Sequence, residues 1–124
     1  MSEVVPLGLY RIAVPYNTTR YYALGEATFQ VSLADADTKF PAGTLKKLVV
    51  RVQSNTLDAD TTITVMKNDA ATPLSITVPA GVTGNFSVAS DVTLAEDDLV
   101  CLKVVAGGTT GSMAFTYRVD FVSA

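Results

Sequence analysis

The side chains that could do acid–base or metal chemistry in this sequence are carboxylates grouped close together. They are Asp35 with Asp37, Asp58 with Asp60, and Glu96 with Asp97 and Asp98. Each group lies where a chain reversal is predicted, so its oxygens could converge on Ca²⁺ or serve as a glycosidase pair. No calcium loop of the roughly twelve-residue type is present, and Asp is a common turn residue. We therefore interpret these groups as solvated turns.

The missing residue types exclude most other catalytic and metal sites. The 124 residues contain no His, no Trp and one Cys. Without His, one chain cannot build a Ser-His-Asp or Cys-His site, nor a His-ligated zinc or haem. One Cys forms no internal disulfide, and Cys101 lies in an apolar run, which predicts a small buried side chain. We expect no enzymatic activity, no catalytic residues, no metal and no cofactor.

The charge pattern bears on the class of partner. The net charge is −3, and the longest run of basic residues is the pair Lys46-Lys47. Binding to a phosphate backbone usually requires a basic patch, so we expect no nucleic-acid partner. The N-terminus has no secretory signal pattern, and the run Leu99–Ala106 is too short to span a bilayer. We expect synthesis in the cytoplasm and no membrane partner.

The elements that must position these residues are strands. Apolar and polar residues alternate in five stretches: 28–33, 48–53, 62–66, 74–78 and 113–121. A period of two is typical of strands with one buried face, and turn residues separate the stretches at short intervals. Residues 95–104 could begin a helix, but we prefer a turn at Glu96–Asp98 followed by a strand. The sequence therefore predicts one all-β domain spanning 1–124, an antiparallel β-sandwich.

Two further patterns suggest contact surfaces. Residues 1–26 hold four of the five tyrosines, and Pro6, Gly8 and Pro15 predict an extended N-terminal arm with short strands. Residues 48–50 and 99–105 are apolar on both faces, which fits either coverage by the arm or a subunit interface, and we favour the interface. The rings could equally cap the sandwich. The candidate interface residues are Tyr10, Tyr16, Tyr21, Tyr22, Val49, Val100, Leu102 and Val104.

Four stretches share a pattern of strand and turn residues. Residues 41–52, 61–69, 74–81 and 92–104 follow the series Gly-Thr-Leu, Val-x-Lys-Asn-Gly and Leu-x-Ala-x-Gly-Asp-x-Val. Asn68-Asp69 replaces Asn-Gly, and Asp97-Asp98 replaces Gly-Asp. In this pattern the chain resembles small jelly-roll domains of phage virion proteins and of bacterial surface or fibre proteins. These are similar in outline to trimeric domains of the tumour-necrosis-factor type. The resemblance implies about eight strands in jelly-roll topology and a homo-oligomer, a trimer.

The function that we expect follows from the architecture and the resemblance. We expect a non-enzymatic structural protein on the virion surface, a phage capsid decoration or cement protein. It would bind the major capsid protein or another virion protein through apolar and tyrosine contacts. The alternative is a glycan-binding module of a tail fibre or surface adhesin. Its Asn and Asp side chains in loops 55–60 or 85–91 would bond sugar hydroxyls, although the absence of Trp weighs against it.

Overall fold

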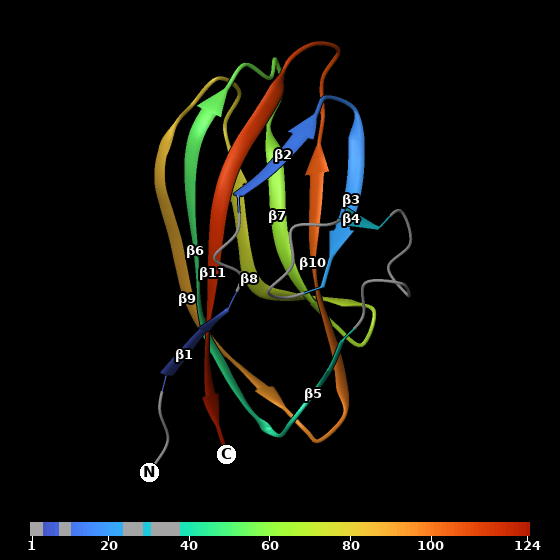
Figure 1. The fold of residues 1–124 in the computed structure, drawn as a ribbon, viewed down its shortest axis with the longest axis vertical. Helices are drawn as coiled ribbons and strands as arrows, with labels where there is room; N and C mark the ends of the chain where they lie inside the picture. Colours follow the sequence, from blue (N-terminus) through green and yellow to red (C-terminus); the bar gives the residue numbers. More distant parts are fainter. Residues whose placement is uncertain (1–3, 8–10, 24–28, 31–37) are drawn as a thin grey trace.

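The computed structural model describes residues 4–7, 11–23, 29–30 and 38–124, and the side chains of 11–23 and 39–124. The described residues form β-strands and no helix (Figure 1). The strands are β1 (Val4–Leu7), β2 (Arg11–Pro15), β3 (Thr18–Tyr22), β4 (Phe29–Gln30), β5 (Thr38–Phe40), β6 (Gly43–Asn55), β7 (Thr61–Lys67), β8 (Ala70–Val78), β9 (Gly84–Leu94), β10 (Asp98–Ala106) and β11 (Ser112–Ser123).

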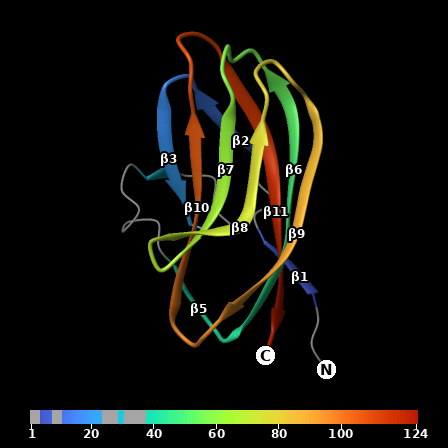
Figure 2. The same cartoon turned by 180° about the vertical axis from the view of Figure 1, so that it is seen from behind.

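The strands form two antiparallel sheets that pack face to face as a sandwich (Figures 1 and 2). Sheet 1 has the order β1-β11-β6-β9, with β2 also paired to β11. Sheet 2 has the order β4-β3-β10-β7-β8, with β5 also paired to β10. The prediction of an all-β antiparallel sandwich is confirmed. The strands outnumber the expected eight because the residues before 41 contribute short strands of two to five residues.

Alternation along the strands builds the core between the sheets. In β11 the side chains of Met113, Phe115, Tyr117, Val119 and Phe121 are buried. The intervening side chains point to the opposite face, as a period of two requires, and apart from the small, buried Ala114 they are only partly covered. Because each fully buried side chain of this size contributes roughly 1.5–3 kcal/mol, the alternation in β6, β10 and β11 determines which face of each strand turns inward.

The N-terminal segment is part of the sandwich rather than an appended arm. Ile12 and Val14 of β2 and Tyr22 of β3 are at most 2% exposed and belong to the core. Strand β2 pairs with β11 in sheet 1, and β3 pairs with β10 in sheet 2. The short strands predicted for this segment are present, and β2 and β3 each extend one of the two sheets; Pro15 marks the end of β2.

The turns keep the conformation that the sequence suggested. Asn68 and Asp69 have φ values of 48° and 66°, so the β7–β8 turn has two consecutive left-handed residues, as in a type I′ hairpin. Asp97, with φ 67°, begins the turn into β10. The segment that could have been a helix is therefore a turn followed by a strand. Asn and Asp tolerate this region better than most residues, so Asp69 serves where glycine is usual.

Candidate interaction surface

Four of the predicted interface residues lie in the core. Val100, Leu102 and Val104 are 0% exposed, and Tyr22 is 1% exposed. Their apolar character is explained by packing between the two sheets, and a side chain with no exposed area cannot contact a second subunit while the sandwich is intact. This corrects their assignment to an interface. On the opposite face of β10, Cys101 is also buried, beside Met66 and the half-buried Tyr21.

The other predicted residues do not come together. Tyr16 lies between β2 and β3 and is 45% exposed. Tyr21 lies on the outer face of sheet 2, with Lys103 Nζ 6.0 Å from its ring centroid. Val49 is half-buried on the outer face of sheet 1. Tyr10 lies outside the described residues.

The surroundings of Val49 are basic. Arg11 of β2, Thr116 of β11 and Arg51 of β6 are register partners and form one row across sheet 1. In the next row Arg118 pairs with Val49. These residues all face away from the core, because their neighbours in each strand are buried.

A third row completes this surface, in which Asp120 of β11 pairs with Lys47 of β6. We call the seven residues of these rows the arginine face. They are Arg11, Lys47, Val49, Arg51, Thr116, Arg118 and Asp120. The face carries four of the nine Lys and Arg residues and one acid, so it is positive in a chain whose net charge is −3.

Three of the four cations on the arginine face have no anionic partner within the described ranges. Arg118 pairs with Asp120, with 2.9 Å between Nε and Oδ1. Arg11, Lys47 and Arg51 form no ion pair there, whereas Lys46 and Lys67 elsewhere are paired with Asp91 and Asp98. Within the part of the chain that the structure describes, these three positive charges are not neutralised, which favours an anionic partner.

A depression interrupts the surface of the arginine face. It has a volume of about 250 Å³ and is lined by Val49, Arg51, Thr116, Tyr117 and Arg118. Tyr117 itself points into the core, where its side chain is 2% exposed. The outward residues therefore supply the chemistry: two guanidinium groups, one hydroxyl and one branched apolar wall.

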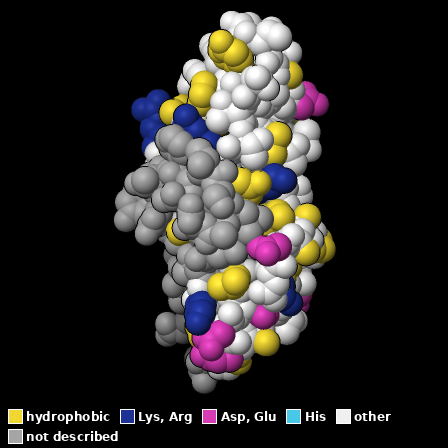
Figure 3. All heavy atoms as spheres, turned by 90° about the vertical axis from the view of Figure 1, so that its right-hand side faces the viewer, with side chains coloured by type: hydrophobic (Ala, Val, Ile, Leu, Met, Phe, Trp, Pro, Cys, Tyr) yellow, Lys and Arg dark blue, Asp and Glu magenta, His cyan; other side chains and the backbone are white. Residues whose placement is uncertain are grey.

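The outer face of sheet 2 has a different character. Its rows consist mainly of hydroxyl and apolar residues: Thr19, Val105, Thr62 and Thr77 in one, and Tyr21, Lys103, Thr64 and Ser75 in the next. The hydroxyls of Thr64 and Ser75 share a hydrogen bond of 2.9 Å. We call these two rows the threonine face. Figure 3 views the right-hand side of Figure 1, where a group of basic side chains lies at the upper left and acidic side chains gather near the lower end.

Side-chain hydrogen bonds fasten the loops at one end of the sandwich. Asp58, in the β6–β7 loop, accepts bonds from Thr109 N (2.8 Å), Thr109 Oγ1 (2.7 Å) and Thr110 N (3.3 Å). These bonds, from the Thr109 hydroxyl first, hold the pKa of Asp58 below its ordinary value. They join the β6–β7 loop to the β10–β11 loop.

Neither of the two loops predicted to bind sugar offers the expected free side chains. In the first, the Asn55 amide is already hydrogen-bonded to the protein backbone, and the second is part of a strand. Asn55 Nδ2 donates to Pro79 O (3.2 Å) and Val82 O (2.9 Å), and its Oδ1 accepts from Leu57 N (3.1 Å). Residues 85–91 are not a loop but lie within β9. The second predicted loop is therefore wrong, and the Asn55 amide already holds the protein's own backbone.

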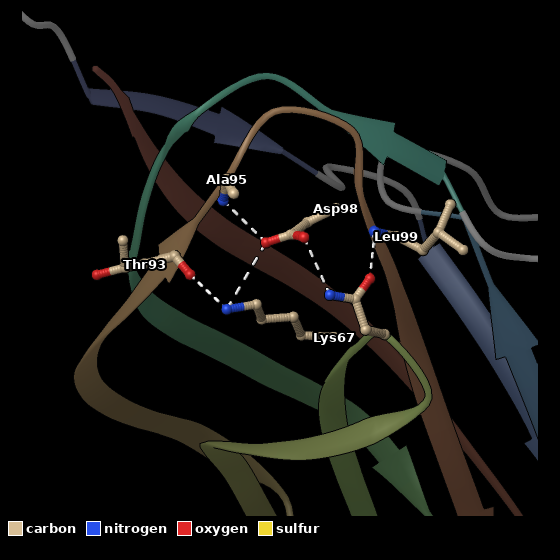
Figure 4. Close-up of polar contacts among 6 residues, drawn as sticks. Lys67, Thr93, Ala95, Asp98 and Leu99 are labelled. Carbon is tan, nitrogen blue, oxygen red and sulfur yellow. Dashed lines mark hydrogen bonds and ion pairs between the residues drawn. The ribbon is translucent and has the colours of Figure 1, made fainter.

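The opposite end is fastened by a charged network (Figure 4). Asp98 Oδ2 accepts from Ala95 N (2.8 Å) and lies 3.6 Å from Lys67 Nζ, while its Oδ1 accepts from Asn68 Nδ2 (3.0 Å). Lys67 Nζ also donates to Thr93 O (2.7 Å). The bond from Asn68, followed by that from Ala95, lowers the pKa of Asp98. Two of the acidic groups noted in the sequence therefore each contain a carboxylate, Asp58 or Asp98, that stabilises a turn or loop through hydrogen bonds.

The remaining observations concern metal ligands, membrane-spanning helices and relatives. In the described part of the chain, no group of three or more His, Cys, Asp or Glu side chains is placed to hold a metal ion. No helix among those residues is long and apolar enough to cross a membrane. No protein-family model matches the sequence, and no curated protein matches it.

Sequence reasoning missed the arginine face because its cations come from three strands far apart in the chain. One signal was present: Lys47, Val49 and Arg51 alternate in β6, so all three lie on the same side of the strand. That Arg11 and Arg118 join them depends on the pairing of β2, β11 and β6, which no short motif encodes.

Proposed function

We propose that this chain is a non-enzymatic structural protein of a phage virion, a capsid decoration protein that docks through its arginine face. The observation that carries the proposal is a set of three cations, Arg11, Lys47 and Arg51, on one sheet of an otherwise acidic chain, none of which has an anionic partner among the described residues. The virion assignment comes from the sequence resemblance described above. The docking face replaces the apolar and tyrosine contacts first expected, because four of the eight side chains predicted to make them are buried in the core.

Jelly-roll topology is part of the proposal, and the strand order supports it. Leaving aside the short strands β1, β4 and β5, sheet 1 has the order β2-β11-β6-β9 and sheet 2 the order β3-β10-β7-β8. The chain crosses between sheets at every step except β7 to β8. This order fits two interlocked Greek keys, the arrangement of a jelly roll. The resemblance also supports a homotrimer at the virion surface.

The docking mechanism rests on charge held by a rigid scaffold. Guanidinium groups bind carboxylates with two parallel hydrogen bonds, and complementary charge speeds association and selects the partner. The strands and fastened loops hold the cations in place before binding, which reduces the entropy lost on association. The partner of this chemistry is a carboxylate-rich surface of the major capsid protein or of another virion protein.

Co-sedimentation with the virus particle from the genome that encodes this chain tests the proposal. Wild-type protein should sediment with particles lacking it, and binding should weaken between 0.05 and 0.5 M salt, roughly, as screening increases. The double variant Lys47→Glu/Arg51→Glu should lose most of this binding. Lys39→Glu is the matched control, because Lys39 is exposed on β5, outside the arginine face. Wild-type protein that never sediments with the particle would refute the proposal.

A further inference from the structure

We propose that the depression on the arginine face is a binding site for a single carboxylate group, seated between Arg51 and Arg118. The inference deepens the proposed docking function, on which it rests, by naming the chemical group that the face recognises. The depression is lined by both guanidinium side chains together with Val49 and Thr116.

The register places the two arginines side by side. Arg51 pairs with Thr116 and Arg118 pairs with Val49, so Arg51 and Arg118 are diagonal neighbours on adjacent strands. Diagonal residues lie roughly 7–8 Å apart, which is within reach of long side chains that share one ligand. Each guanidinium presents a planar fork of N–H donors, so the two can hold both oxygens of one carboxylate.

The hydrogen-bonding capacity of both side chains is largely unused. Arg51 is exposed and forms no ion pair or hydrogen bond within the described ranges. Arg118 is 41% exposed and contacts Asp120 through Nε, so its terminal nitrogens, which carry four of the five N–H donors, are left for a ligand. The Thr116 hydroxyl adds a neutral donor to the lining of the depression.

The size of the depression limits what can carry the carboxylate. Its volume of about 250 Å³ lies below the roughly 300–1,000 Å³ of sites for drug-sized ligands. It fits one sugar ring or one amino-acid side chain, with Val49 against the apolar part of either. Acidic sugars and acidic side chains share this chemistry, and the experiment below distinguishes them.

Asp120 is a built-in competitor for the same cations. Its carboxylate already lies 2.9 Å from Arg118 Nε and is only 16% exposed. An incoming carboxylate must therefore bind close to an existing negative charge. Removal of that charge by Asp120→Asn should strengthen binding, whereas a purely structural role for Asp120 would leave the affinity unchanged.

A nuclear magnetic resonance titration tests the site directly. The methyl signals of Val49 and Thr116 are followed while glucuronate or N-acetylglutamate methylamide is added at low salt. Glucose and N-acetylglutamine methylamide are the neutral controls of the same shape. Both acidic probes should shift these signals, and whichever binds more tightly identifies the source of the carboxylate. Neither neutral probe should shift them.

Matched variants make the test specific. Arg51→Gln and Arg118→Gln should each weaken binding about tenfold, because one charge-assisted interaction is lost. Asp120→Asn should tighten it roughly threefold at low salt. Lys39→Gln should change nothing. Signals that stay unshifted at saturating probe, or shifts that persist unchanged in Arg51→Gln, would overturn the inference. If the titration fails in this way but Lys47→Glu/Arg51→Glu still abolishes binding to the particle, the docking function is supported and only the carboxylate site is refuted.

Discussion

The two outer faces of the sandwich cover the same core yet carry opposite chemistry. The arginine face of sheet 1 holds Arg11, Lys47, Arg51 and Arg118, and only Arg118 has an anionic partner among the described residues. The threonine face of sheet 2 holds hydroxyl and apolar side chains, and its only charge, Lys103, lies against the ring of Tyr21. In an antiparallel sandwich only the inward residues are constrained by the core. The difference between the outer faces therefore points to a difference in use.

The largest effect should come from the core that both faces share. Leu102 is fully buried between the sheets, and its register partners on the neighbouring strands of sheet 2 are Val65 and Tyr22. Leu102→Ala should lower the free energy of unfolding by about 2–5 kcal/mol, through lost burial and a residual cavity. Urea unfolding followed by circular dichroism measures this.

The matched control for this change is Val105→Ala on the threonine face, since Val105 belongs to the same strand and is 37% exposed. Its cost should stay within about 0.5 kcal/mol. Equal costs for the two substitutions would contradict the assignment of β10's inner and outer faces.

A smaller loss of stability should come from substitutions in the loops that connect the strands of the two sheets. Gly111 has φ +97°, and a Cβ there would press against Thr56 O. Gly81 has φ +70°, but a Cβ there would meet open space. Gly81→Ala should cost about 1 kcal/mol from backbone strain alone, and Gly111→Ala roughly 2–4 kcal/mol because overpacking is added. Thermal unfolding of the pair measures the difference, and a Gly81 variant as unstable as Gly111→Ala would count against the packed loop end.

Acid should weaken the two ends of the sandwich, where Asp58 and Asp98 brace the turns. Asp58 and Asp98 have pKa values below the ordinary 3.8, because hydrogen bonds favour their charged forms. Their contribution to stability is therefore present above about pH 3.8, the unfolded value, and is lost as pH falls through the lower folded values. Asp98→Asn should reduce stability at neutral pH and flatten the acid side of the curve. Parallel curves for wild type and variant between pH 7 and 2 would contradict this role.

The smallest effects compare one side-chain pair on each face. Arg118 and Asp120 form a partly exposed ion pair, whereas Thr64 and Ser75 share a neutral hydrogen bond. Double-mutant cycles should give a coupling of about 0.2–1 kcal/mol for either pair. Only the ion pair should weaken when salt is raised, since screening acts on charges. A salt-dependent Thr64–Ser75 coupling would mean that the two faces do not differ as described.

Local pattern was enough to predict the strands but not the surfaces. The alternation from Met113 to Phe121 identifies β11 and its buried side correctly, because burial of one face imposes a period of two. Residues 99–105 were interpreted as two-faced, yet Val100, Leu102 and Val104 pack in the core, while Cys101 is buried on the other side. Periodicity alone does not tell which face of an all-apolar strand is covered by the same chain.

The arginine face lay beyond local pattern for a related reason. Arg11, Arg51 and Arg118 become neighbours only through the pairing of β2, β6 and β11, and register between distant strands is a property of the whole fold. Lys46-Lys47 was the one basic pair visible in the sequence. Of those two, Lys46 forms an ion pair with Asp91, and Lys47 belongs to the face.

The most direct test of the account compares one charge reversal on each face. Arg51→Glu on the arginine face and Lys103→Glu on the threonine face change the net charge equally. Both proteins are first checked for wild-type thermal unfolding, and their binding to the particle from the encoding genome is then measured by co-sedimentation. The account predicts that Arg51→Glu weakens binding at least tenfold and that Lys103→Glu leaves it within about twofold. Equal losses, or a loss confined to Lys103→Glu, would contradict the arginine face as the docking surface.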